Sequence, residues 1–146
     1  FRSDSPYTYY SPFSPWYYSP FGRDNSGTRF HYDNIAILSY DSTGNMEWSN
    51  FVRKEQYDDE TDDFLSYQMV NIGTELHFLY NDPYRRSYIL TDNSITPDGK
   101  LTVEPTLRNL DKGYVWMPRY GRQISARQVV VPCVYRNFIC FAKIDF

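Results

Sequence analysis

The sequence predicts an all-β protein built as an antiparallel meander. Aromatic residues make up 19% of the 146 residues, with 15 Tyr, 10 Phe and 3 Trp, and this composition favours sheet over helix. Apolar residues alternate with polar ones at the two-residue period of half-buried strands. Turn-forming residues separate these segments at regular intervals. The chain has the length of one ordinary domain, enough to bury a sizeable core.

The clearest element is a hairpin between Asn34 and Gln56. An apolar strand leads into Asp41-Ser42-Thr43-Gly44-Asn45, and a second strand follows with Trp48, Phe51 and Val52. Gly44 is the residue type that tolerates a positive φ at a tight turn. The pattern therefore predicts two antiparallel strands joined by this turn.

The first 29 residues have a different composition from the rest of the chain. They read FRSDSPYTYYSPFSPWYYSPFGRDNSGTR, with prolines at positions 6, 12, 15 and 20. Proline removes a ladder donor and is excluded from helix interiors and central strands. We therefore predict a Tyr/Pro/Ser-rich loop or insertion over 1–29 and an antiparallel β domain over 30–146.

The β domain is expected to consist of short strands joined by turns. We predict strands at 34–40, 46–53, 64–71, 75–81, 87–91, 101–107, 114–117, 128–135 and 138–146. The remaining predicted connections are Asn71-Ile72-Gly73-Thr74, Asn81-Asp82-Pro83, Pro97-Asp98-Gly99-Lys100 and Arg136-Asn137. A sandwich, a barrel or a propeller can be built in this way.

A weak echo between two hairpins favours repeated propeller-like blades. Residues 37–46 and 95–101 share an apolar residue, an Asp, a Gly and a second apolar residue in the same order. At about 40 to 50 residues for a four-stranded blade, the β domain supplies about two to three blades. A propeller closes with about four or more, so we expect either part of a larger wheel or sheets packed in another way.

Charge and hydropathy exclude several classes of protein. The net charge of −3 argues against a general nucleic-acid binder, which would show a strongly basic face. No segment approaches the ~20 apolar residues of a transmembrane helix. Residues 54–63 are acidic and residues 114–146 are basic, which is typical of a solvated loop and a charged sheet face.

Catalytic and metal sites find little support in the sequence. The carboxylates of 58–63 could bind calcium, but they lack the glycine and the order of a calcium loop. His31 and His77 are the only imidazoles, and the alternation around His77 predicts a hydrogen-bonded structural residue. We predict no catalytic, cofactor-binding or metal-binding residue, which favours a protein without enzymatic activity.

Two cysteines could lie opposite each other in the last hairpin. If Arg136-Asn137 forms a two-residue turn, Cys133 pairs with Cys140. Directly opposed residues have Cα atoms about 5.5 Å apart, within the range that a disulfide accepts. The sequence therefore leaves two alternatives, a cross-strand disulfide or two ordinary buried thiols.

The aromatic side chains of the first loop are candidates for a partner contact. Large, stiff, amphipathic rings of this kind are common in interfaces, and sugars can stack on them. The alternative is that the loop folds back over its own sheet. The residues are Tyr9, Tyr10, Phe13, Trp16, Tyr17 and Tyr18.

As an ordered set, several segments resemble the C-terminal part of a group of propeller-like exported proteins of Bacteroidota. The matching segments are YYSPFSPWYYSPFGR, NIAILSYDSTGNMEW, FVRKEQ, ELHFLYND, Asp98-Gly99-Lys100, and the segments that begin at Gln123 and end at Phe146. The resemblance implies an exported cell-envelope protein with further N-terminal blades. It implies no catalytic residues.

These observations lead to one functional hypothesis and two alternatives. We expect a non-catalytic binding or scaffold module of a bacterial cell-envelope protein or complex, whose partner is another protein or N-terminal blades of the same chain. The main alternative is a carbohydrate-binding module or a propeller-type glycan-active enzyme, with Trp16 or Trp48 exposed in a groove near acids. The second alternative is a self-contained β-sandwich.

Overall fold

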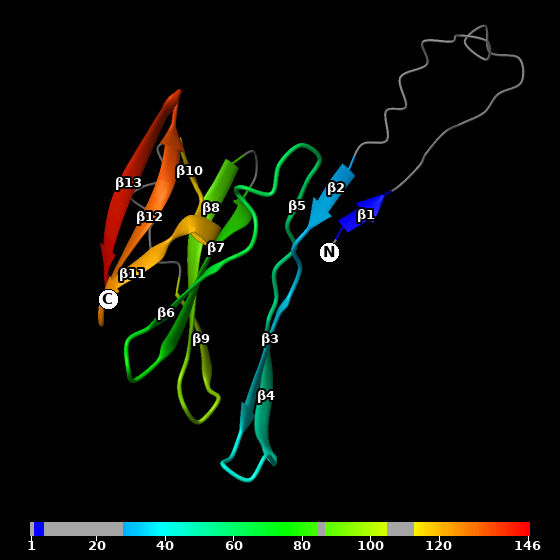
Figure 1. Ribbon diagram of the computed structural model, residues 1–146, viewed down its shortest axis with the longest axis vertical. Coiled ribbons are helices and arrows are strands. Elements are labelled where there is room, and N and C mark those ends of the chain that lie inside the picture. The colour runs from blue at the N-terminus through cyan, green and yellow to red at the C-terminus, as the bar shows by residue number, and fades with distance from the viewer. Residues whose placement is uncertain (1, 5–27, 85–86, 105–112) are drawn as a thin grey trace, which may run out of the picture.

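The computed structural model describes residues 2–4, 28–84, 87–104 and 113–146. The described residues form an all-β structure in which the strands of every sheet pair antiparallel (Figure 1). None of these sheets closes on itself into a barrel. The predicted fold class is confirmed at this level.

The predicted hairpin is present as β3 (Ile35–Tyr40) and β4 (Met46–Val52). Its register places Ile35 opposite Val52 and Tyr40 opposite Met46. The turn is closed by the carboxylate of Asp41, which accepts hydrogen bonds from the backbone N–H groups of Thr43 and Asn45, both at 2.8 Å. This local network explains why the reversal occurs at this point in the chain.

A four-stranded meander forms the central sheet. Its strands are β6 (Gln68–Asn71), β7 (Leu76–Tyr84), β8 (Ser87–Ile95) and β9 (Leu101–Glu104), in that order. The prediction of a turn at 81–83 was wrong, because β7 continues through Pro83 to Tyr84. β6 pairs only with residues 76–79 of β7, so Pro83 meets a neighbouring strand on one side alone and its missing N–H is tolerated.

Strand β8 extends to Ile95, beyond the predicted end at residue 91. Its additional residues Asp92, Asn93 and Ser94 are polar and buried. The neighbouring strand β7 supplies hydrogen-bond partners for Asp92 and Asn93, as in the 2.8 Å bond from Asn93 Nδ2 to the Tyr80 hydroxyl.

The third sheet contains β10 (Tyr114–Trp116), β11 (Arg122–Ser125), β12 (Gln128–Tyr135) and β13 (Phe138–Asp145). β13 lies along one edge of β12, so β10 and β11 share the other edge. They form one strand interrupted by the 3₁₀ turn η2 (Pro118–Tyr120). β11 was not predicted, and all four of its residues are exposed, which left no apolar alternation to read.

A small sheet lies beyond the hairpin. It consists of β1 (Arg2–Asp4), β2 (Thr28–His31) and β5 (Tyr57–Asp58), none of which was predicted as a strand. The ladder between β1 and β2 pairs residues 2–4 with residues 28–30. The two ends of the Pro-rich segment are therefore held side by side, and the predicted partner-contact residues between them lie outside the described residues.

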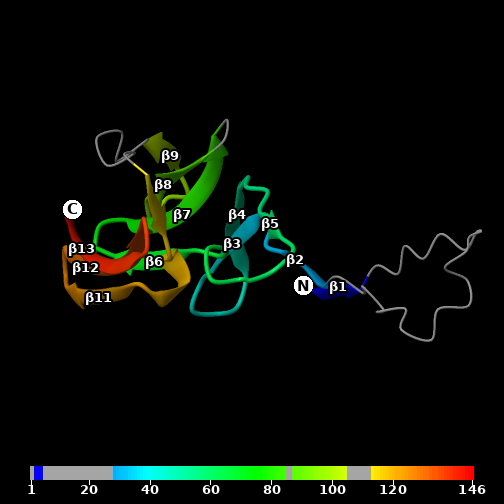
Figure 2. The same cartoon turned by 90° about the horizontal axis from the view of Figure 1, so that it is seen from above.

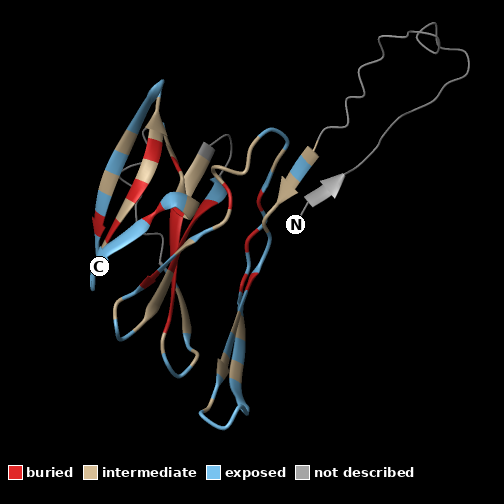
Figure 3. Cartoon of the chain, in the orientation of Figure 1, coloured by how far each residue is buried: buried red, intermediate tan, exposed pale blue. Residues whose placement is uncertain are grey.

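The hairpin, the central sheet and the third sheet stack as three layers (Figures 1 and 2). The strand alternation of β7 directs Phe78 and Tyr80 toward the hairpin and Leu79 toward the third sheet. Figure 3 shows buried residues in strands of both the central sheet and the third sheet. One cluster contains Ile35, Val52, Phe78, Tyr80 and Ile95, and the other Val70, Leu79, Leu90, Trp116, Val129, Val131, Cys133 and Ile144.

Candidate binding site

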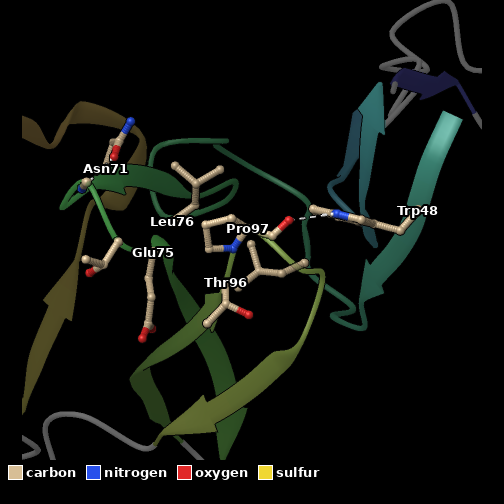
Figure 4. Close-up of a pocket in the computed structure, with 9 residues that line it drawn as sticks. Trp48, Asn71, Glu75, Leu76, Thr96 and Pro97 are labelled. Carbon is tan, nitrogen blue, oxygen red and sulfur yellow. Dashed lines mark hydrogen bonds between the residues drawn. The ribbon is translucent and has the colours of Figure 1, made fainter. Parts of the chain in front are cut away.

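A pocket opens between the hairpin and the turns at one end of the central sheet (Figure 4). Its volume is about 250 Å³. β4 contributes one lining side chain, and the β6–β7 and β8–β9 turns with their flanking residues contribute the others. The lining residues are Trp48, Asn71, Gly73, Thr74, Glu75, Leu76, Ile95, Thr96 and Pro97.

Trp48 is fixed in this wall by two contacts with the β8–β9 turn. Its indole Nε1 donates a 2.9 Å hydrogen bond to the carbonyl of Pro97 (Figure 4). Its ring packs on Gly99, where an added Cβ would lie 2.9 Å from the nearest ring atom. Gly99 also has a φ of +83°, so this position requires glycine for both its conformation and its lack of a side chain.

Several polar groups of the pocket wall are already engaged in turns. The Asn71 side-chain oxygen accepts the N–H of Gly73 at 2.8 Å. The Thr96 hydroxyl donates to the Asp98 carboxylate and accepts the N–H of Lys100 at 3.2 Å. Glu75 is the one ionisable residue among the described lining residues, but its side chain points away from Leu76, Pro97 and Trp48 (Figure 4).

His77 is hydrogen-bonded, as the sequence predicted. Its Nδ1 lies 2.8 Å from a carboxylate oxygen of buried Asp92. Its ring packs against Phe146 with centroids 4.6 Å apart. Its Nε2 is 3.9 Å from the Glu75 carboxylate, which is beyond hydrogen-bond distance.

The acidic segment 58–63 connects with basic and aromatic side chains from distant parts of the chain. Asp59 accepts hydrogen bonds from Arg29 at 2.5 and 2.9 Å. Asp62 pairs with Arg119 and accepts the Tyr32 hydroxyl at 2.9 Å. Asp63 accepts the hydroxyl of Tyr120 at 2.6 Å. We call the contacts of Arg119 and Tyr120 with this segment the η2 latch.

These contacts change the acidity of the carboxyl groups. Hydrogen bonding to Arg119 lowers the pKa of Asp62, and hydrogen bonding to the Tyr120 hydroxyl lowers the pKa of Asp63. The carboxylates of this segment thus act as structural acceptors. Among the described residues, no group of three or more His, Cys, Asp or Glu is arranged to hold a metal ion.

A buried lysine joins the polar contacts between the layers. Lys54 is only 7% exposed, and its ammonium donates to the carbonyl of Tyr32 at 2.5 Å and to the side chain of Gln56 at 2.7 Å. Burial lowers the pKa of Lys54 to about 8. Gln56 in turn donates to the carbonyl of Asn81 at 2.6 Å, so the network reaches the central sheet.

The predicted register of the two cysteines is confirmed. Cys133 lies opposite Cys140, and Arg136 has the positive φ of 54° that a tight two-residue turn requires. Both thiols are free in this structure, and burial raises the pKa of Cys133. The disulfide stays a prediction.

Both outer faces of the three-layer stack expose apolar side chains. Figure 3 shows exposed residues along β13 and along the hairpin. On β13, Ile139 and Phe141 point away from the central sheet and are 68% and 71% exposed. On the hairpin, the corresponding residues are Leu38, Tyr40, Met46 and Phe51, each more than half exposed. Apolar residues in such continuous patches are typical of interaction surfaces.

Sequence reasoning placed Trp48 near a possible groove but did not identify its neighbours. Glu75, Thr96 and Pro97 come from two turns that are distant in sequence from Trp48, and the bond from Trp48 to Pro97 spans 49 residues. Only the hairpin echo between 37–46 and 95–101 hinted at a relation between these turns. This echo could not show that the β8–β9 turn packs on Trp48 of the β3–β4 hairpin.

The chain matches no protein-family model, no curated protein and no solved structure. Within the part of the chain that the structure describes, no helix has the length and apolarity needed to cross a lipid bilayer.

Proposed function

We propose that the protein is a non-catalytic binding or scaffold module that packs further β-sheet against the outer faces of its three layers. In this proposal the layers are propeller-like blades, and the neighbouring sheet belongs to a protein partner or to further blades of the same chain. The resemblance to propeller-like exported proteins extends the proposal to the bacterial cell envelope.

The observation that carries the proposal is the apolar character of the outer faces. Within the stack, alternate residues of one sheet pack on alternate residues of the next, and they are buried. The outer faces present the same kind of residue to solvent, with Phe141 71% exposed on one side and Phe51 57% exposed on the other. Burying one such side chain contributes roughly 1.5 to 3 kcal/mol, so a matching sheet would stabilise both partners.

The strand β13 offers a matched pair of residues for the test. Phe138 and Phe141 are equally exposed at 71% and lie on the same strand. Phe141 belongs to the outer face, whereas Phe138 pairs with Tyr135 at the end of the strand and has the opposite orientation. A photo-crosslinking amino acid at position 141 therefore samples the outer face of β13, and one at position 138 samples the opposite face.

The experiment uses cells that naturally make the chain. We expect position 141 to give crosslinks to apolar residues of another strand, either in a partner protein or elsewhere in the same polypeptide. Ile139→Thr should remove these crosslinks. The proposal is wrong if position 141 gives no more product than position 138.

One observation favours the alternative of glycan binding, since Trp48 lines a concave pocket near the acid Glu75. Sugars require several free hydrogen-bonding groups as well as an aromatic ring. Here the side-chain groups of Asn71, Thr96 and Trp48 that bond to the turns are already occupied. The described lining also contains a single carboxylate, whereas glycoside hydrolysis ordinarily uses two. We therefore prefer the scaffold function.

A further inference from the structure

Strand β13 leaves one edge of the third sheet open (Figure 1). In the part of the chain that the structure describes, β13 pairs with β12 and with no other strand. Its ladder with β12 covers all 8 residues without a register shift, and none of them is a proline. Native proteins commonly block an open edge with a bulge or a proline. Since β13 has neither, its edge is a template for another strand.

The hydrogen bonds beside this ladder show which backbone groups face the open edge. The N–H of Phe146 donates to the carbonyl of Arg127 at 2.9 Å, which makes residues 127 and 146 a hydrogen-bonded pair. Such pairs alternate along an antiparallel ladder, so residues 144, 142, 140 and 138 also bond to β12. The N–H and C=O groups of Ile139, Phe141 and Lys143 therefore point to the open edge.

The edge of β6 in the central sheet offers a contrast, because a side chain covers its end. The Gln123 side chain accepts the N–H of Asn71 at 3.1 Å and donates to the Asn71 carbonyl at 2.7 Å. Among the residues that the structure describes, no side chain makes such bonds to the backbone of residues 139, 141 and 143. These groups are available to a strand from outside the described chain.

We infer that a second copy of this chain pairs with this edge, so that two β13 strands run antiparallel about a two-fold axis at Phe141. Each strand then bonds to the other through the N–H and C=O groups of Ile139, Phe141 and Lys143. The two third sheets become one continuous sheet. The inference goes beyond the scaffold function, which concerns the outer face of this sheet and not its edge.

The strand is complementary to itself in this register. Phe141 meets its own copy, and aromatic pairs across strands are favourable. Ile139 of one copy faces Lys143 of the other, where the aliphatic stem of the lysine covers the isoleucine. Asp145 lies opposite the turn that carries Arg136 in the other copy, so opposite charges meet. An axis one residue closer to the C-terminus would instead bring the two Lys143 side chains diagonally together, which is unfavourable.

Hydrogen exchange of the backbone amides tests this pairing in the wild-type chain. The amides of residues 140 and 142 bond to β12 and serve as internal references for those of residues 139, 141 and 143. One shared ladder is a small interface, which is typical of weak association, so we expect a dimer Kd on the order of 10 to 100 μM. Between concentrations well below and well above this Kd, exchange at 139, 141 and 143 should slow by about fivefold. Exchange at 140 and 142 should stay constant.

A proline at position 143 provides a variant that acts on the edge alone. Lys143→Pro removes an N–H that points outward, so the ladder with β12 loses no bond. The chain already carries Pro132 in β12, opposite Phe141 and outside the hydrogen-bonded pairs. Sedimentation velocity should show dimerisation weakened by about tenfold or more in Lys143→Pro. Lys143→Ala keeps the N–H and should still dimerise.

Three results would overturn the inference: a monomer at about 1 mM wild-type chain, no slowing of exchange at 139 and 141, or equal dimerisation of Lys143→Pro and Lys143→Ala. A dimer that survives Lys143→Pro but is lost in Ile139→Thr would assign self-association to the outer face instead. The exchange experiment needs no variant, so it decides the matter even if Lys143→Pro does not fold. In cells, a crosslink from position 141 to β13 of a second copy reports this edge, whereas one to any other strand reports the outer face.

Discussion

Two glycines with the same backbone conformation have different surroundings. Gly44 and Gly99 both occupy the left-handed region, with φ of +87° and +83°. At Gly44, no neighbour lies within 4 Å of an added Cβ, whereas at Gly99 the ring of Trp48 lies at 2.9 Å. The first position therefore requires glycine for conformation alone, and the second for both conformation and packing.

Comparing the two alanine variants separates these effects. Gly44→Ala should lower the free energy of unfolding by roughly 1 kcal/mol, the cost of a non-glycine residue in this region. Gly99→Ala should cost about 1 to 3 kcal/mol more, because the methyl group displaces the Trp48 ring. Urea unfolding of both variants measures the difference, and equal losses would contradict the packing role of Gly99.

Lys54 predicts a dependence of stability on pH. Its pKa in the folded protein, about 8, lies below the ordinary value of 10.5. The unfolded chain therefore binds more protons between these values, and the stability of the folded state rises with pH across this window. Below pH 8 Lys54 is charged in both the folded and the unfolded chain, so burial of its ammonium lowers the free energy of unfolding by the full amount.

The Lys54→Met variant should lose this pH dependence. Relative to the variant, the wild type should gain about 2 kcal/mol in unfolding free energy between pH 8 and pH 10, while ionisation of the tyrosines affects both proteins alike. Lys143→Met is the control, because Lys143 is exposed. Parallel stability curves for wild type and Lys54→Met would show that Lys54 keeps its ordinary pKa.

At the scale of elements, the interruption between β10 and β11 creates the η2 latch. η2 separates two segments that pair with the same edge of β12, and this break projects Arg119 and Tyr120 toward the acidic segment. Arg119 also lies over the ring of Tyr32, 5.9 Å from its centroid. One short turn therefore connects the third sheet with the segment that follows the hairpin.

Removing the latch should loosen the acidic segment more than the core. We expect Arg119→Met to lower the free energy of unfolding by about 1 kcal/mol at neutral pH. The lowered pKa of Asp62 contributes stability above its ordinary pKa, about 3.9, and this contribution is lost as the pH falls. The difference between wild type and variant should therefore shrink in acid.

Carboxyl NMR resonances provide the measurement, and the pKa of Asp62 should rise in Arg119→Met. Lys143 and Asp145 form an exposed pair at 3.5 Å that offers a comparison. Lys143→Met should change stability very little, because exposed ion pairs contribute little. An unchanged pKa of Asp62 in Arg119→Met would contradict the latch.

At the scale of the whole molecule, one buried asparagine ties the layers together. Asn81 is 0% exposed, and its side chain donates to the carbonyl of Phe64 at 2.8 Å and to the carbonyl of Trp116 at 2.7 Å. The backbone carbonyl of Asn81 accepts a hydrogen bond from the side chain of Gln56. The central sheet is therefore joined through Asn81 to the third sheet and to the segment after the hairpin.

We expect Asn81→Leu to destabilise the fold by about 3 kcal/mol, because the buried carbonyl of Trp116 and the partly buried carbonyl of Phe64 both lose their donor. Asn93→Leu is a matched control, since Asn93 is also buried but bonds to the Tyr80 hydroxyl within the same sheet. Asn93→Leu should lose about half as much unfolding free energy as Asn81→Leu. The free energy of unfolding of both variants is measured in denaturant. Equal losses would show that the bonds of Asn81 between layers contribute no more to stability than a bond within one sheet.

The sequence by itself determined the local features of this protein. Alternation of apolar and polar residues located most of the strands, and the Asp41–Asn45 and Arg136-Asn137 turns set the registers of their hairpins. These features were predictable because the residues that specify a hairpin turn lie within a few positions of one another. The opposition of Cys133 and Cys140 followed from the turn alone.

Only the tertiary structure decided which sheet faces meet and what they enclose. Asp92 and Asn93 are buried in a strand because the neighbouring strand β7 brings His77 and Tyr80 to them, and the alternation of their own segment does not indicate those partners. In the same way, the pocket forms where Trp48 crosses to Pro97, 49 residues away. Packing between layers joins residues whose separation in sequence is large and irregular, so no local pattern could specify it.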